Sequence, residues 1–152
     1  MFKFILIASL ALASCSGRQH TPAQTTRITI EAAAHGLAVV DTAVSQAISR
    51  DSRQPHPPGA VHDKWHGTVE ALEHARSDLV LAERAVDTYT TAHDSACPAY
   101  VAVLAVKGST GELTDALHAV GITIPEAFNA TLFMLLTAAQ SLAPQCPDGG
   151  VL

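Results

Sequence analysis

The chain has 152 residues, with 9 Lys and Arg against 14 Asp and Glu, and its formal net charge is −5. An acidic chain with scattered basic residues offers no electrostatic footprint for nucleic acid and no polybasic surface for anionic lipid. Apolar residues make up 48% of the chain but aromatic residues only 5%. This composition is typical of closely packed helices and excludes a β-sandwich or a disordered chain.

The first residues have the pattern of a secretory signal peptide. Lys3 precedes a short apolar stretch, Phe4 to Ala13, which is shorter than the about 20 residues of a membrane-spanning helix. The stretch ends in Leu12-Ala13-Ser14-Cys15, which resembles the lipobox of bacterial lipoproteins. This resemblance implies that residues 1–14 are removed and that Cys15 becomes an acylated N-terminus. The alternative is an ordinary signal peptide with a chance cysteine near its cleavage site.

The same resemblance implies a location. Stable anchoring takes two lipid signals, and a multiply acylated Cys15 supplies them without help from the protein. Ser16 follows the cysteine, where lipoproteins retained in the inner membrane carry aspartate. For a Gram-negative host, the resemblance therefore implies the outer membrane, with the protein facing the periplasm. The expected partners are the membrane, through the lipid anchor, and an envelope protein, but no nucleic acid.

Removal of residues 1–14 leaves 138 residues with a net charge of −6, a normal size for one domain. We expect a lipidated N-terminus and tether over 15–26, a helical domain over 27–147 and a flexible tail over 148–152. Cys97 and Cys146 remain, and in an oxidising compartment such a pair favours a disulfide. Closing a loop of about 50 residues stabilises by about 4 kcal/mol in the chain-entropy model. The alternative is two unpaired buried thiols.

Two long helices are predicted after the tether. From Arg27 to Asp51, apolar residues recur at helical spacing, and Pro55 is the first of several prolines that end this helix. From Ala60 to His93, the spacing alternates between four and three residues, which is a heptad seam. The seam residues are Val61, Trp65, Thr68, Leu72, Ala75, Leu79, Ala82, Val86 and Tyr89. We expect these two helices to form an antiparallel hairpin.

The remaining chain predicts a C-terminal helical cluster. A short helix from Pro98 to Lys107, a turn at Gly108 and Gly111, and a second short helix from Glu112 to Val120 are expected. Gly121 stops the second helix. The segment from Glu126 to Leu142 is apolar almost all round, so it is predicted to be the buried central helix. The expected fold is an all-α helical bundle, in which a long antiparallel hairpin packs on a C-terminal cluster stapled by Cys97–Cys146.

Few residues indicate a catalytic or metal-binding site. His62 and His66 lie four apart on the long helix, with Glu70 and Glu73 a turn further, and such a set can hold a metal. They lie where histidines are usually solvated, so no metal or other cofactor is expected. The exported part has no Gly-x-Ser-x-Gly elbow and no phosphate-binding glycine motif, so we do not expect an enzyme. Trp65 and Tyr89 are expected to fill the core rather than to stack on a ligand.

The sequence therefore favours a membrane-anchored lipoprotein with a non-catalytic structural or partner-binding role. Two alternatives remain open. One is a phage-derived lysis lipoprotein, because outer spanins are similar in their lipobox and in a coil-forming periplasmic part. The other is a periplasmic metal-binding lipoprotein that uses His62 and His66.

Overall fold

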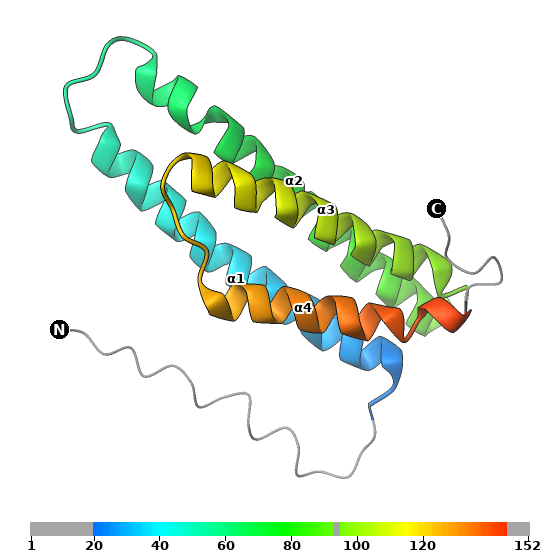
Figure 1. Ribbon diagram of the computed structural model, residues 1–152. Coiled ribbons are helices and arrows are strands. Elements are labelled where there is room, and N and C mark those ends of the chain that lie inside the picture. Colours follow the sequence, from blue (N-terminus) through cyan, green and yellow to red (C-terminus); the bar gives the residue numbers. More distant parts are fainter. Residues whose placement is uncertain (1–19, 93–94, 146–152) are drawn as a thin grey trace.

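The computed structural model describes residues 20–92 and 95–145, which form an all-α bundle of four helices (Figure 1). The helices are α1 (Pro22–Asp51), α2 (Ala60–Ala92), α3 (Cys97–Ala119) and α4 (Glu126–Gln140), followed by a short 3-10 helix, η1 (Ala143–Gln145). The all-α prediction is confirmed for this part of the chain. The predicted signal segment 1–14 and tail 148–152 lie outside the described residues.

The first helix begins earlier than predicted. Thr21 is its N-cap: the hydroxyl accepts a hydrogen bond from the Gln24 backbone N–H (3.3 Å), and the Gln24 side chain accepts one from the Thr21 N–H (3.0 Å). This reciprocal pair is a capping box. Pro22 takes the first helical position, where its missing N–H has no partner to lose. Pro22 to Thr26, predicted as part of the tether, therefore belong to the helix, and Thr26 is fully buried.

The second helix follows the predicted heptad seam. The prediction of helix from Ala60 to His93 agrees with the observed Ala60–Ala92. Large and small side chains alternate along the seam, so neighbouring helices come close at the small positions. The buried seam residues are Trp65, Thr68, Leu72, Ala75, Leu79, Ala82 and Val86. The core-filling role predicted for Trp65 is confirmed, since its side chain is buried among these residues.

The third helix is continuous, and the predicted turn at Gly108 and Gly111 is wrong. Each of these glycines costs about 1 kcal/mol relative to alanine in a helix. A single buried stripe runs past both of them and offsets this cost; it consists of Val103, Val106, Leu113 and Leu117. The buried Thr110 hydroxyl donates a hydrogen bond to the Val106 carbonyl (2.6 Å), so this polar group has its partner within the helix. The chain turns where predicted, at Gly121, whose φ is +79°.

The fourth helix lies at the side of the bundle, so its predicted role as the buried central helix is wrong. It ends at Gln140 and buries only one stripe, made by Phe128, Leu135, Ala138 and Ala139. Phe133 remains 71% exposed. The helix is apolar on more faces than the bundle covers, which explains why its composition suggested a central position.

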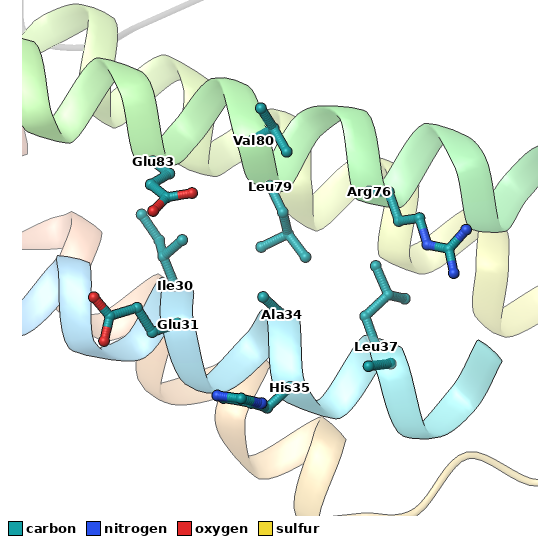
Figure 2. A pocket seen from close by; sticks show the side chains of 10 residues that line it. Ile30, Glu31, Ala34, His35, Leu37, Arg76, Leu79, Val80 and Glu83 are labelled. Atoms are coloured by element: carbon teal, nitrogen blue, oxygen red, sulfur yellow. The ribbon is translucent and has the colours of Figure 1, made fainter. Parts of the chain in front are cut away.

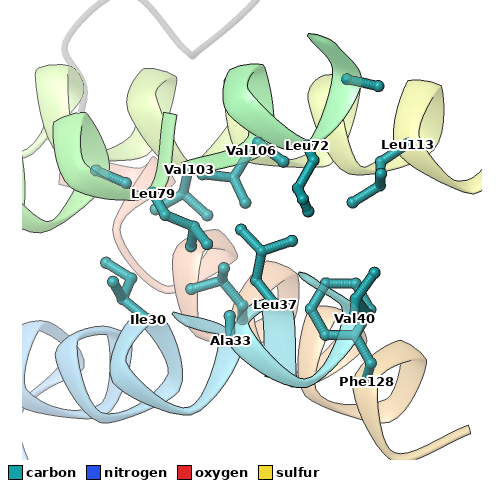
Figure 3. Close-up of a cluster of buried hydrophobic side chains, with 14 of the residues drawn as sticks. Ile30, Ala33, Leu37, Val40, Leu72, Leu79, Val103, Val106, Leu113 and Phe128 are labelled. Atoms are coloured by element: carbon teal, nitrogen blue, oxygen red, sulfur yellow. The ribbon is translucent and has the colours of Figure 1, made fainter. Parts of the chain in front are cut away.

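The four helices form a ring in which each packs against two neighbours, in the order α1, α2, α3, α4 and back to α1. The most extensive packing is between α2 and α3, and α1 packs against α4 as extensively as against α2. The predicted hairpin and C-terminal cluster are therefore parts of one bundle. Figure 3 shows the shared core, where Leu37 of α1, Leu72 and Leu79 of α2 and Val106 of α3 point toward one another.

The contact between α1 and α4 depends on a glycine. Gly36 of α1 lies against the ring of Phe128 of α4, and a Cβ at this position would overlap the ring. Phe128 is itself buried, so its ring has little room to move. Gly67 of α2 provides a matched comparison, because a Cβ there meets open space.

We predict that Gly36→Ala lowers the free energy of unfolding, because forced overpacking of a core costs about 1–3 kcal/mol and exceeds the gain in helix propensity. Gly67→Ala should instead stabilise the protein by about 1 kcal/mol. Urea denaturation followed by circular dichroism measures both. Equal effects of the two substitutions would contradict the close approach of α1 and α4.

Candidate functional site

The predicted lipidation and disulfide residues are only partly described. Cys15 and Cys146 lie outside the described residues, so acylation and the Cys97–Cys146 bridge stay predictions. Cys97 is the first residue of α3 and is half-buried. The 3-10 helix η1 packs against α3 and ends at Gln145, directly before Cys146.

The candidate metal pair lies near the start of α2. The rings of His62 and His66 are 5.1 Å apart between centroids, and both side chains are exposed. Each has a carboxylate of its own: His62 Nδ1 is 3.4 Å from Asp63, and His66 Nδ1 is 3.1 Å from Glu70. Within residues 20–92 and 95–145, no three His, Cys, Asp or Glu side chains gather in a way that would hold a metal. The structure therefore adds no ligand to the pair.

A polar cluster that the sequence analysis missed joins α1 to α2. The carboxylate of Asp51, at the end of α1, accepts hydrogen bonds from Lys64 Nζ (2.9 Å) and from the indole N–H of Trp65 (2.8 Å). His56 Nε2 lies 3.3 Å from the same carboxylate. Hydrogen bonds from Lys64 and Trp65 lower the pKa of the Asp51 carboxyl below its usual 3.8. The cluster links the end of α1 to the start of α2 across their connection, and it includes Trp65, the only tryptophan of the chain.

Two further ion pairs set the register of α1 against α2. Arg27 of α1 meets Asp87 of α2 at 3.4 Å, and Asp41 of α1 meets Arg76 of α2 at 2.5 Å. Residue numbers rise along α1 as they fall along α2, so the two helices are antiparallel. Exposed pairs of this kind contribute little stability individually. They mark the two ends of an open groove.

A groove between α1 and α2 lies in the stretch bounded by these ion pairs. It has a volume of about 450 Å³ and is lined from both helices. Figure 2 shows Ile30 and Leu37 of α1 and Leu79 of α2 pointing into the space between the helices. On the α1 side the groove is shallow, because Ala34 and Ala38 contribute only methyl groups to its lining. The floor is therefore apolar and open to solvent.

Charged side chains are placed at the ends of the groove. Glu31 and Glu83 lie near one end and Arg76 at the other (Figure 2). Arg76 is paired with Asp41, and Glu31 is paired with Arg27 at 3.3 Å, so among the described residues Glu83 is the charged residue of the lining without an ion-pair partner. His35 lies on the rim. An apolar floor with a few charges at its ends suits the apolar face of a partner helix, whose side chains at i, i+3 and i+4 anchor in such grooves.

We predict that Asp51→Asn lowers the melting temperature at neutral pH. The lowered pKa means that ionised Asp51 stabilises the fold above its unfolded pKa of about 3.9 and that this contribution is lost as pH falls through the folded value. The difference from wild type should therefore shrink below about pH 4. Thermal unfolding against pH measures it, with Asp63→Asn as the control, because Asp63 is exposed. A difference that does not change with pH would contradict the role of the charge.

Comparisons with protein-family models, with curated proteins and with solved structures find no match for this chain. The lipobox resemblance at Leu12-Ala13-Ser14-Cys15 and the geometry of the helical surfaces are what support a function.

Proposed function

We propose that the protein is a lipid-anchored envelope protein, held in the outer membrane on its periplasmic face, with a non-catalytic partner-binding role. The lipobox ending at Cys15 supports the anchor, and Ser16 supports the outer membrane. The capped start of α1 at Thr21 supports a folded body that begins a few residues after the lipid.

The α1–α2 groove is the observation that carries the binding role. Its floor is apolar and open to solvent, and at one end Glu83 has no ion-pair partner among the described residues, whereas Glu31 is paired with Arg27. These features fit an amphipathic helix of an envelope protein that lays its apolar face between α1 and α2, with a basic residue near Glu83. The compact four-helix packing differs from the coil-forming part of outer spanins, so that alternative gains no support.

The Cys97–Cys146 bridge is part of the same proposal. η1 lies beside the N-terminal end of α3 (Figure 1), and the chain leaves η1 at Gln145, one residue before Cys146. Leu142, just before η1, is fully buried and holds this end of the chain in the core. Export to an oxidising compartment then favours the bond.

We predict that the protein isolated without reductant has no free thiol at Cys97 or Cys146. Peptide mass spectrometry of the alkylated, unreduced chain should find the two residues in one linked peptide. The double variant Cys97→Ala/Cys146→Ala should lose about 4 kcal/mol of stability, since the denatured chain regains the freedom of a loop of about 50 residues. Alkylation of both thiols in the wild-type protein would rule out the bridge.

The groove is tested by site-specific photo-crosslinking in cells. A photoreactive amino acid at Ala34, in the groove, should give one crosslinked envelope protein, whereas the same substitution at Ala105, exposed on α3, should not. Charge reversal by Glu31→Lys with Glu83→Lys should reduce the Ala34 crosslink at least tenfold. The Cys15→Ser variant should leave the membrane fraction and lose the crosslink.

Two results would contradict the proposal separately. The same crosslinks at Ala34 and at Ala105, or no effect of the charge reversal, would contradict binding in the groove. Recovery of the Cys15→Ser variant in the membrane fraction at wild-type level would contradict the lipid anchor.

A further inference from the structure

The charged residues are distributed unequally around the bundle. In α4, Glu126 is the first residue, and no Asp, Glu, Lys or Arg follows it up to Gln145. The helix α2 carries many charges, which are Asp63, Lys64, Glu70, Glu73, Arg76, Asp78, Glu83, Arg84 and Asp87. One side of the molecule is therefore uncharged, and the sides formed by α2 are charged and mostly acidic.

The uncharged side exposes large apolar side chains. Phe133 and Met134 of α4 are exposed, and with Pro22, Thr25 and Thr29 of α1 they line a shallow groove of about 550 Å³. The same side continues along α1, because residues three or four apart share a helix face. Gly36 packs on α4, so the neighbours Ala32 and Val39 extend this side of α1, and Val39 is 60% exposed. We call the surface made by Thr25, Ala32, Val39, Phe133, Met134 and Thr137 the uncharged face.

The helix α1 has more apolar side chains than the bundle buries. By length and composition alone, α1 is apolar enough to cross a membrane, with an 18-residue window of mean hydropathy 1.2, but only 28% of that window is buried in the bundle. Ile28 and Val39 of α1 are 50% and 60% exposed, so these large apolar side chains are left outside the core.

The N-terminus of the described chain lies at the uncharged face. His20 lines the groove together with Pro22 and Phe133. The chain from Cys15 to His20 spans at most about 18 Å when fully extended. A lipid on Cys15 would therefore hold this end of the bundle close to the bilayer surface.

We propose that the lipidated bundle lies on the bilayer through the uncharged face, with Phe133 and Met134 in the interfacial region of the lipid. This inference rests on the proposed lipid anchor. Aromatic and large apolar side chains without neighbouring charges are suited to the boundary between headgroups and acyl chains. The acidic surfaces of α2 are repelled by anionic lipid, so they face away from the membrane. In this orientation the α1–α2 groove lies at the edge of the contact and stays open to a partner.

The orientation is tested with a tryptophan reporter in the full-length lipidated protein. Phe133→Trp places the reporter on the uncharged face, and Val101→Trp places a control on α3, which lies diagonally across the ring from α1 and leaves Val101 45% exposed. The native Trp65 is buried and common to both variants. Each variant is incorporated into vesicles of phosphatidylethanolamine and phosphatidylglycerol, with or without brominated acyl chains, which quench nearby indoles.

We expect brominated lipid to quench the emission of Phe133→Trp at least twofold more than that of Val101→Trp, which should behave like the wild type. Met134→Trp should report the same quenching, and it replaces Phe133→Trp if circular dichroism shows that the latter does not fold. Equal quenching at positions 133 and 101, in protein that floats with the vesicles, would overturn the orientation while leaving the anchor intact. Shielding of position 133 in crosslinked dimers without bromide quenching would assign the face to a second copy and overturn the proposal. Failure of the protein to float with the vesicles would contradict the anchor, and the orientation with it.

Discussion

The buried seam of α2 is the constraint on which the rest of the structure depends. It alternates large residues such as Trp65, Leu72 and Leu79 with small ones such as Ala75 and Ala82. The large side chains fill the centre of the ring, and the small ones let α1 and α3 approach from either side. Because α2 touches both of these helices, its seam fixes the distance between them. α4 then closes the ring against α1 and α3.

Polar contacts select the register that the apolar seam allows. Arg27–Asp87, Asp41–Arg76 and Asp51–Lys64 occur along the α1–α2 pair, and each links residues that are neighbours only in the antiparallel arrangement. Asp51 is the sheltered member of this set, since its carboxylate also holds the Trp65 indole. Apolar burial, to which the seam contributes, supplies most of the stability, and the ion pairs contribute alignment.

The sequence predicts those parts of the fold in which local pattern and burial agree. The pattern predicts the α1 helix and the α2 seam because each has one apolar face at helical spacing. The break at Gly108 was predicted wrongly, since burial of Val106 and Leu113 outweighs the local preference of glycine. The position of α4 was also wrong, because an apolar sequence does not say whether its apolar faces are covered by protein.

The surfaces of interest depend on geometry that the sequence pattern does not contain. The Asp51–Trp65 contact requires the course of the chain between α1 and α2, and the α1–α2 groove requires the spacing of the two helices at Ala34 and Ala38. The uncharged side of α4 was visible in the sequence as a run without charges, but it was interpreted as burial. Because this side is exposed, its uncharged residues are a candidate surface for contact with lipid.

The proposed location, groove and orientation all require a lipid at Cys15. The most direct test is the intact mass of the mature protein, extracted in detergent from the membranes of its native host, followed by mass spectrometry of its N-terminal peptide. We predict a chain that begins at Cys15 and carries a diacylglyceryl group on the sulfur and an acyl chain on the α-amino group. A mature chain that begins at another residue, or a Cys15 without added acyl mass, would contradict it.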